Sequence, residues 1–366
     1  MNEKHLTYFK VENFKRFESF EMDNIGQFNL ILGDNNVGKT SVLEALAFDE
    51  ESIENYISNL TAILNQRSIV FLREMYNRET NDVEDNYLTF LINKNKKNES
   101  IKTAFAYKDG NIQKMSLVAD TEIALFENYL EDYRSFYKTK NEDEISYRLY
   151  LMMKVNDKSK FMRWQALAFR NRNKQPLPII FFAQTYESDL LNFYFDYTQK
   201  DRKDKFIETL KLFIPTIKDI EPTKWYGREM LGIREIDNSF MPLSMYGDGV
   251  NRLVRILLQL PACKGKRLMI DEVDAGIFHQ RFTTFWRYIL EAAKQNDVQI
   301  FATTHNVECI SYFKEVLEKD EFKHLSSQAR TITLFQTKDN NVQARTRNFE
   351  AFQEAIDEGY NIRGGE

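Results

Sequence analysis

The sequence predicts an α/β fold with a mixed central sheet, an antiparallel β meander and a helical insert. Three observations support this prediction. A short apolar run at 28–32 leads directly into a glycine loop and then into a helix-forming segment. From residue 250 onward, apolar strands alternate with amphipathic helices, as is typical of a parallel sheet covered by helices. Between these regions, strand-like segments separated by turn residues indicate an antiparallel meander.

The composition is that of a globular chain. Hydrophobic residues make up 43% of the 366 positions and charged residues 29%, which excludes a wholly disordered or collagen-like chain. The net charge of -5 argues against a uniformly basic nucleic-acid coat, although a local basic patch stays open. Cys263 and Cys309 form no C-x-x-C pair, so neither a disulfide scaffold nor a cysteine zinc site is indicated. Because we find neither a secretory leader nor a long apolar run, we expect a cytoplasmic protein without a membrane span.

Hydrophobic periodicity predicts the elements in chain order. Strands fill the first 32 residues, and a helix covers 49–78. The middle of the chain is then expected to contain strands at 87–92, 101–107 and 112–118, helix over 121–174, a strand at 177–184 and a helix at 201–213. The remainder is expected to contain a helix at 250–260, a strand at 266–274, a helix, a strand at 298–304, a helix, two strands near 330–336 and 341–346, and a last helix over 349–358.

These elements predict a division of the chain into three parts. The core is formed by residues 1–48, 83–120, 177–184 and 240–366. A helical insert spans 49–82. A helical subdomain, which is a candidate partner-binding region, comprises 121–176 and 185–239.

The loop after the first apolar strand carries the strongest chemical signal. Residues 33–40 match G-x-x-x-x-G-K-[ST], in which glycines let successive backbone N–H groups face a phosphate. Lys39 would reach the β- and γ-phosphates, and the Thr40 hydroxyl would bind Mg²⁺. The helix that follows offers its positive N-terminal end to the same anion. The expected nucleotide-binding residues here are Gly33, Asn35, Asn36, Gly38, Lys39, Thr40 and Ser41.

Two adjacent acids end the apolar strand that begins near residue 266. Asp271 suits a direct or indirect Mg²⁺ role, and Glu272 is placed to polarise an attacking water as a general base. A second acid beside the metal-binding one indicates hydrolysis as well as binding. His305, at the end of the next strand, could hydrogen-bond the γ-phosphate and report its loss.

The order of these signals resembles the ABC-type ATPases of the SMC/RecF branch. The similar segments are the opening strand at 11–19, the Walker A segment at 33–46, the signature motif and helix at 243–258, the Walker B and D-loop at 268–278, and the switch-histidine strand at 301–310. In overall layout the chain is most similar to compact bacterial ATPases of phage-defence and abortive-infection operons, which resemble the ATPase half of overcoming-lysogenisation-defect proteins.

The resemblance implies a site shared by two chains, holding ATP and Mg²⁺. The signature segment of one chain, with Ser244, Gly247 and Gly249, would close over the γ-phosphate bound by the other. The family's pattern has two glycines directly after the serine, whereas Met245 and Tyr246 intervene here. By the same resemblance, Gln184 would touch Mg²⁺ and the attacking water, and the D-loop residue Asp274 would lie at the contact between chains.

The expected function is therefore an ATP-dependent dimerising switch that controls an effector in antiviral defence. Only about 60 residues follow His305, too few for a nuclease domain beside the elements already expected there, so a nuclease or toxin effector would be a separate chain. One alternative is a RecF-like DNA-binding clamp in DNA repair, whose ATPase activity DNA would stimulate. The other is a scaffold that binds nucleotide without hydrolysing it.

A basic and aromatic segment lies within the expected helical subdomain. Its basic residues could hold a nucleic-acid backbone while its aromatic rings stack on bases. The other interpretation is a helix with aromatic core residues and solvated charges, and the acidic run at 142–144 suits a protein partner equally well. The residues concerned are Lys158, Lys160, Phe161, Arg163, Trp164, Phe169, Arg170, Arg172 and Lys174.

Overall fold

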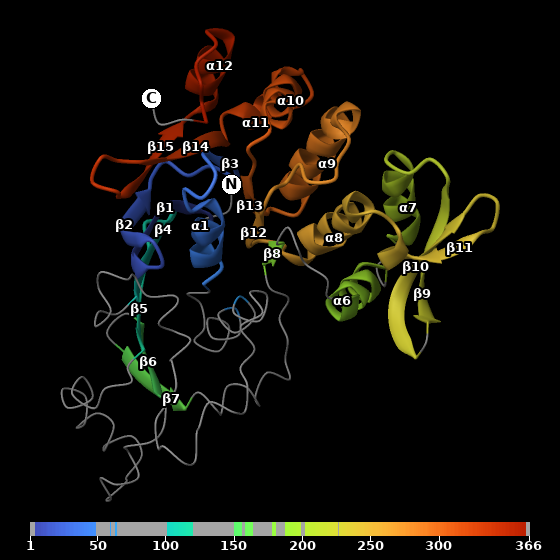
Figure 1. The fold of residues 1–366 in the computed structure, drawn as a ribbon, viewed down its shortest axis with the longest axis horizontal. Helices are drawn as coiled ribbons and strands as arrows, with labels where there is room; N and C mark the ends of the chain where they lie inside the picture. Colours follow the sequence, from blue (N-terminus) through green and yellow to red (C-terminus); the bar gives the residue numbers. More distant parts are fainter. Residues whose placement is uncertain are drawn as a thin grey trace, which may run out of the picture.

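The computed structural model describes part of the chain, and that part folds around two six-stranded sheets and a smaller three-stranded one (Figure 1). Within the described part, no helix is long and apolar enough to cross a membrane. The described residues are 4–48, 59, 63, 101–119, 150–155, 158–163, 178–180, 187–198, 202–225 and 227–363.

The first sheet is antiparallel throughout, in the order β2-β1-β4-β5-β6-β7. The strand segments expected at 101–107 and 112–118 are confirmed, and the strand expected at 87–92 lies outside the described residues. The strands of this first sheet are β1 (Leu6–Phe14), β2 (Phe17–Met22), β4 (Ile101–Tyr107), β5 (Ile112–Ala119), β6 (Tyr150–Val155) and β7 (Lys158–Arg163).

The prediction of helix across 121–174 is wrong where the structure describes it. Residues 150–163 contain the paired strands β6 and β7, so the basic residues Lys158, Lys160 and Arg163 belong to a strand and not to a helix. Leu, Met and Lys are good helix formers, but pairing of β6 along β5 overrides that local preference.

The second sheet is mixed, as the sequence predicts, in the order β15-β14-β3-β13-β12-β8. All neighbours are parallel except β14 and β15. Because β3 lies between β14 and β13, the loop that follows it starts at the middle of the sheet. The strands are β3 (Phe28–Gly33), β8 (Ile179–Ile180), β12 (Arg267–Ile270), β13 (Gln299–Thr303), β14 (Ala329–Gln336) and β15 (Val342–Arg347).

The mixed sheet is buried on both faces. On β12, Leu268 and Ile270 pack into one core whereas Met269 packs into the other, as the two-residue period of a strand requires. Helix α1 (Lys39–Leu46) fills the space between the two large sheets. The opposite face is covered by α8 (Asp248–Ala262), α9 (Phe282–Gln295), α10 (Val307–Glu318), α11 (Lys323–Ser326) and α12 (Phe349–Asp357).

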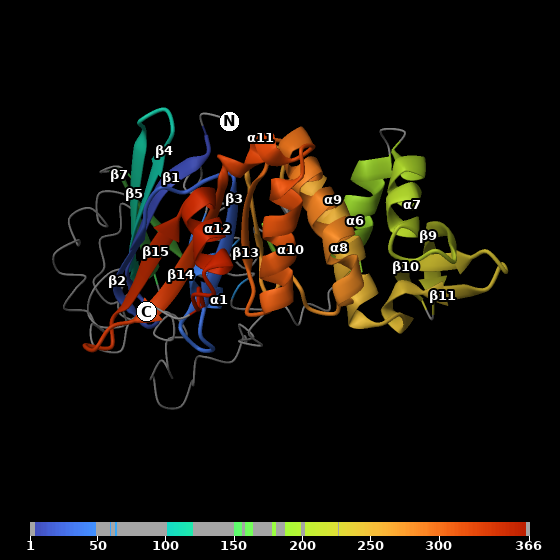
Figure 2. The same ribbon diagram turned by 90° about the horizontal axis from the view of Figure 1, so that it is seen from above.

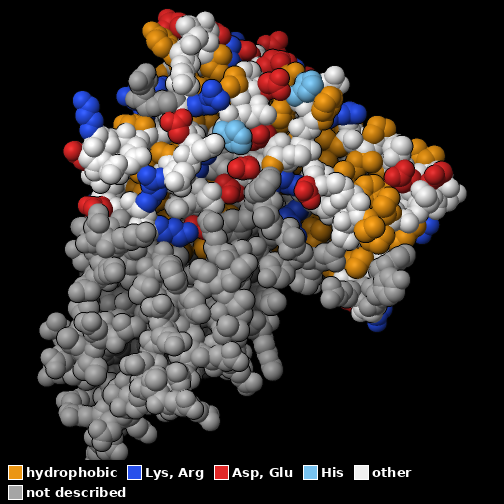
Figure 3. Space-filling model, in the orientation of Figure 1, with side chains coloured by type: hydrophobic (Ala, Val, Ile, Leu, Met, Phe, Trp, Pro, Cys, Tyr) orange, Lys and Arg blue, Asp and Glu red, His pale blue; other side chains and the backbone are white. Residues whose placement is uncertain are grey.

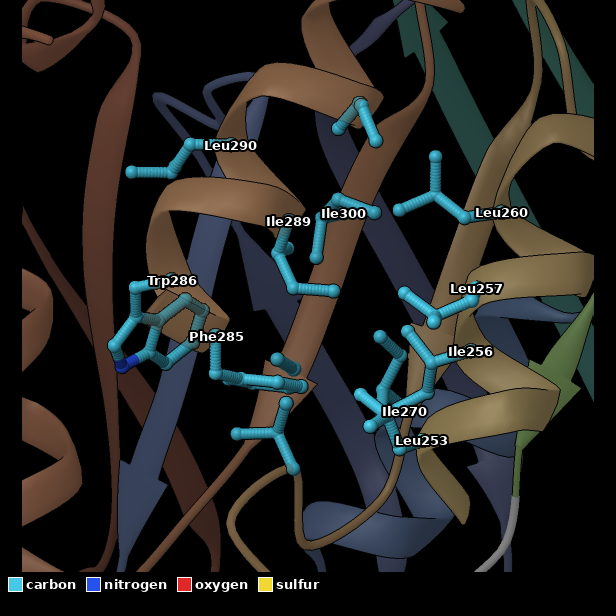
Figure 4. Packing of buried hydrophobic residues seen from close by; sticks show 14 of the residues in the cluster. Leu253, Ile256, Leu257, Leu260, Ile270, Phe285, Trp286, Ile289, Leu290 and Ile300 are labelled. Carbon is cyan, nitrogen blue, oxygen red and sulfur yellow. The ribbon is translucent and has the colours of Figure 1, made fainter. Parts of the chain in front are cut away.

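Figure 4 shows how α8 and α9 pack on this face. Leu257 from α8 and Ile289 from α9 point toward Ile300 of β13, and all three are almost completely buried. Burying one such side chain stabilises the fold by roughly 1.5–3 kcal/mol. The core therefore fixes α8 against the strands that end at the candidate site.

A smaller unit packs against α8 on the side away from α1 (Figure 2). The helix expected at 201–213 is confirmed as α7, and two long strands that the sequence did not predict pair next to it. The elements are α6 (Glu187–Thr198), α7 (Lys203–Lys211), β9 (Ile217–Trp225), β10 (Arg228–Glu235), β11 (Phe240–Pro242) and the short 3₁₀ turn η3 (Leu243–Met245).

The helices and strands expected after residue 250 are confirmed in order and type. The elements there are α8, β12, the 3₁₀ turn η4 (His279–Arg281), α9, β13, α10, α11, β14, β15 and α12. The predicted division of the chain into core, insert and subdomain stays a prediction.

Candidate functional site

The phosphate loop joins β3 to α1 at the centre of the mixed sheet. Gly33 and Gly38 have φ angles of 143° and 109°, a region that side chains rarely adopt. A Cβ at Gly33 would also lie 2.7 Å from the carbonyl oxygen of Leu334. Both glycines are therefore required by the backbone path. Asn35 and Asn36 are exposed on the tip of the loop, and Ser41 is half-buried in the first turn of α1.

The Lys39 side chain folds back over the loop that precedes it. Its Nζ donates to the carbonyl oxygens of Gly33 at 2.7 Å and of Asp34 at 2.8 Å. An ammonium has three donors, and within the described residues these two carbonyls are its acceptors, so one N–H is left for an anion. Burial lowers the pKa of Lys39, and the carboxylates of Asp271 and Glu272 act in the opposite direction.

Thr40 and Asp271, which are 231 residues apart in the chain, meet below the loop. The Thr40 Oγ1 lies 3.2 Å from Oδ1 and 3.1 Å from Oδ2 of the Asp271 carboxylate. A hydroxyl and a carboxylate at this spacing are the hard oxygen ligands that Mg²⁺ prefers. Thr303, from the neighbouring strand, donates to the Asp271 Oδ1 at 2.8 Å.

The Asp271 carboxyl is almost completely buried. Burial raises its pKa, while hydrogen bonds from Thr303 and Thr40 and the positive charge of Arg252 lower it. Arg252 comes from α8, and its guanidinium donates to the Asp271 backbone carbonyl oxygen. The start of α8 is thus joined directly to the acid end of β12.

Glu272 follows Asp271 at a turn in an uncommon conformation. Its φ angle is 47°, the left-handed region that non-glycine residues occupy at a cost. Its backbone N–H donates to the Thr303 Oγ1 at 2.7 Å. The Glu272 side chain is half-buried, its charge opposes the burial that lowers the pKa of Lys39, and the hydrogen bond to Thr303 holds the backbone turn that carries it.

His305 lies just beyond β13, where its side chain is exposed. The neighbouring residue Thr304 is buried, and its Oγ1 donates to the Asp274 Oδ1 at 2.5 Å. Asn306 caps α10 by accepting from the backbone N–H groups of Glu308 and Cys309. The histidine is thus positioned by a fixed strand end on one side and a capped helix on the other.

The signature segment lies elsewhere in the molecule. Ser244 is exposed on η3, and Gly247 is the exposed N-cap residue of α8. The phosphate loop with α1 and the start of α8 are well separated in both ribbon views (Figures 1 and 2). Gly249 packs against Gly276 of the segment expected to be the D-loop, and Arg252 of the same helix reaches the Asp271 backbone, so within one chain the signature helix contacts the acid end of β12 and the turn that follows it.

The two residues that interrupt the signature pattern have opposite environments. Tyr246 packs against the core, and its hydroxyl donates to the Glu235 Oε1 at 2.9 Å. Burial, with the nearby Glu235, raises the pKa of Tyr246 to about 12. Met245 is 70% exposed. The inserted pair therefore anchors the segment to β10 and leaves an apolar side chain facing outward.

Two residues at this site were not found from the sequence, and one expected residue lies outside the described part of the chain. Thr303 and Arg252 both contact Asp271. The signal for Thr303 was present, because a parallel neighbour of the acid-ending strand places its last residue beside the first acid. Gln184 lies outside the described residues.

These residues fit a nucleotide with Mg²⁺. The loop backbone is open to a phosphate only because glycines stand where a Cβ would collide with other atoms. The donor set beside it consists of one hydroxyl, one carboxylate and an ammonium. Mg²⁺ is commonly bound by one or two such carboxylates together with substrate phosphates. Lys39, Thr40 and Asp271 are the residues that would hold the nucleotide and its Mg²⁺.

The fold and the site together define a P-loop ATPase. The family model described as "AAA domain, putative AbiEii toxin, Type IV TA system" matches residues 28–311. The chain belongs to this family.

The chain is also similar to individual proteins, to one in sequence and to others in fold alone. A protein of Helicobacter pylori (strain ATCC 700392 / 26695) named "ATP/GTP phosphatase" is 24% identical over 341 residues, which cover 86% of this chain and 89% of that protein. A crystal structure of an Smc head bound to the C-winged helix domain of ScpA matches with a TM-score of 0.50 at 11% identity, covering 96% of this chain and 99% of that one. An SMC head domain from Thermotoga maritima matches with a TM-score of 0.44 at 14% identity, covering 94% of this chain and 99% of that one.

Proposed function

We propose that this protein is an ATP-dependent switch that works as a pair of identical chains. Each of two ATP molecules would be bound between the phosphate loop of one copy and the signature segment of the other. Hydrolysis, with Mg²⁺ neutralising phosphate charge, would then release the pair. A ligand that binds only the closed pair shifts the population toward it, and this makes the site a switch.

One observation supports this proposal: the two segments expected to bind phosphate, the phosphate loop and the signature segment, lie apart within one chain. Lys39, Thr40 and Asp271 converge in one place, whereas Ser244 and Gly247 are exposed in another. The N-terminal end of a helix, with its N–H groups and positive dipole end, is suited to binding an anion. A second copy, related by a two-fold axis, would bring the missing half to each site.

The surface around the signature segment also suits a contact between copies. Met245, Phe278 and Val307 are 70%, 60% and 52% exposed. Met245 follows the signature serine, Phe278 ends the segment expected to be the D-loop, and Val307 lies two residues after His305. Hydrophobic side chains also gather on the face in Figure 3 over the end of the molecule that carries the small sheet. Exposed apolar groups of this kind are common at protein–protein contacts.

Within the closed site each residue has a distinct task. Lys39 and the loop N–H groups would bind the phosphates, and Thr40 and Asp271 would hold Mg²⁺. Glu272 would orient and deprotonate the attacking water, and His305 would contact the γ-phosphate. Gln184 is proposed as a further ligand near the metal. The name of the Helicobacter relative supports hydrolysis and includes GTP, so both nucleotides should be tested.

Mixing two defective chains tests the shared site. Lys39→Ala removes the ammonium from one half, and Ser244→Arg blocks the other half at an exposed position where it leaves the fold intact. Each variant alone should show no ATP hydrolysis, and an equal mixture should recover about a quarter of the wild-type rate, since half the pairs are mixed and each holds one intact site. A mixture as inactive as its components, or a Ser244→Arg chain with wild-type activity, would contradict the shared site.

The output is proposed to be control of a separately encoded effector, a nuclease or toxin, in antiviral defence. The family description, which names a toxin and a toxin–antitoxin system, supports this part. Phage infection of cells carrying the wild-type protein and its neighbouring genes should reduce phage yield, and the Lys39→Ala variant should not. Equal yields with both, together with ATPase activity stimulated by duplex DNA, would favour the repair clamp instead.

A further inference from the structure

Thr303 is a fully buried polar residue between the two strands that carry the site. It ends β13, which lies between β3, leading to the phosphate loop, and β12, ending at the acids. The parallel register pairs Ala302 with Ile270, so Thr303 lies next to Asp271. Its position thus brings one hydroxyl to both carboxylate-bearing residues.

The contacts of Thr303 determine the direction of its hydroxyl proton. Its Oγ1 lies 2.7 Å from the Glu272 backbone nitrogen, which can only donate. The same oxygen therefore accepts there, and its proton goes to the Asp271 Oδ1 at 2.8 Å. The Thr303 carbonyl oxygen also accepts from the Val273 backbone N–H at 2.8 Å.

We propose that Thr303 is a positioning residue for the reaction proposed above. Its hydroxyl turns the Asp271 carboxylate toward Thr40 and holds the left-handed turn that presents Glu272. This inference rests on the proposed function, because it concerns the same two acids. Groups that orient a metal-binding carboxylate commonly change metal affinity or activity about 10–100-fold when removed.

Three substitutions separate this role from simple packing. Thr303→Val keeps the shape and removes the hydroxyl, and Thr303→Ser keeps the hydroxyl and removes the methyl group. Thr331→Val is the matched control: Thr331 is also fully buried, on the nearby strand β14, and within the described part of the chain its hydroxyl has no hydrogen-bond partner. Thermal melting of all three variants checks that they fold.

Two readouts are measured for each variant. The first is kcat for ATP hydrolysis at saturating Mg²⁺, and the second is the Mn²⁺ concentration that gives half-maximal tight binding of a fluorescent ATP analogue. Thr303→Val should lower kcat about 10–100-fold and raise the Mn²⁺ requirement about 10-fold or more. Thr303→Ser should recover most of both values, and Thr331→Val should equal the wild type.

The outcomes separate this inference from the proposed function. Equal behaviour of Thr303→Val and Thr331→Val overturns the role of Thr303, and so does a Thr303→Ser variant as impaired as Thr303→Val. If the wild-type protein binds the analogue but does not hydrolyse ATP, the proposed hydrolysis is wrong. The Mn²⁺ requirement for analogue binding then still decides the role of Thr303. A wild-type protein that binds no nucleotide overturns both.

Discussion

Gly249→Ala should destabilise the fold, whereas Gly247→Ala in the same signature segment should not. A Cβ at Gly249 would lie 1.9 Å from the carbonyl oxygen and 2.7 Å from the carbonyl carbon of Gly276. Real Cβ atoms do not approach backbone atoms so closely, and neither partner is a flexible side chain that can move away. The start of α8 and the D-loop must therefore separate by about 1 Å or more, as overpacked sites do.

The magnitude follows from that displacement. Overpacking of this kind costs about 1–3 kcal/mol. Each kcal/mol shifts Tm by roughly 2–4 °C in a domain of about 150–250 residues, and by less in a longer chain. With about 2 °C per kcal/mol for this chain, Gly249→Ala should lower Tm by about 2–6 °C. At Gly247 nothing lies within 4 Å of the added Cβ, and its φ of -60° suits alanine. There the loss of a good N-cap residue is offset by a stiffer unfolded chain.

Thermal melting without nucleotide measures the difference directly. Both variants alter the same proposed phosphate-binding segment, so melting without ligand excludes any contribution from nucleotide binding. A Gly249→Ala protein that melts at the same temperature as Gly247→Ala would refute the argument from the backbone contact with Gly276.

Two further predictions follow from the acids and from a buried histidine. Glu272→Gln keeps the shape of the side chain and removes the base, so the variant should bind ATP without hydrolysing it. It should therefore accumulate as an ATP-bound pair of chains, which light scattering after size-exclusion chromatography would detect. A variant that stays monomeric at every ATP concentration would count against this prediction. His5 is buried with its Nε2 3.1 Å from the Asp297 carbonyl oxygen, and burial lowers its pKa below 6.5 despite the opposing effect of Asp297. The unfolded chain then binds the extra proton as pH falls below 6.5, so stability should decrease with acidification by at most about 1.4 kcal/mol per pH unit. Urea unfolding should show a flatter pH dependence for His5→Gln, and an unchanged slope would remove His5 as the cause.

The last third of the chain could be predicted well because its elements are long and strongly periodic. Helices α9 and α10 each bury one apolar face, α8 is buried all round between residues 252 and 260, and β12 and β13 contain the apolar runs 268–270 and 300–302. Such patterns identify the element type without knowledge of its neighbours.

The middle of the chain could not be predicted as well because its strands depend on tertiary pairing. Pro222 breaks the apparent strand pattern of β9, but β9 is an edge strand of its sheet, where a residue without an N–H is tolerated. Likewise, β6 contains good helix formers and becomes a strand through pairing with β5. Propensity alone could not show that these partners exist.

At the candidate site the sequence located the charged groups but not what holds them. The spacing of the phosphate loop and the position of the acid pair at a strand end assigned both Thr40 and Asp271 to Mg²⁺, and in the structure the Thr40 Oγ1 lies 3.2 Å from the Asp271 Oδ1. The left-handed backbone at Glu272 depends on a contact with Thr303, 31 residues away, and the anchoring of Tyr246 depends on Glu235, 11 residues away on a neighbouring strand. No local pattern encodes them.

The backbone angle of Glu272 has an evolutionary consequence. A glycine at this position would relieve about 1–2 kcal/mol of steric cost, so the folded protein is less stable by that amount because it keeps a carboxylate there. Laboratory selection for thermal stability alone should therefore replace Glu272. Selection that also requires ATP hydrolysis should keep Glu272 and raise the stability through substitutions at other positions.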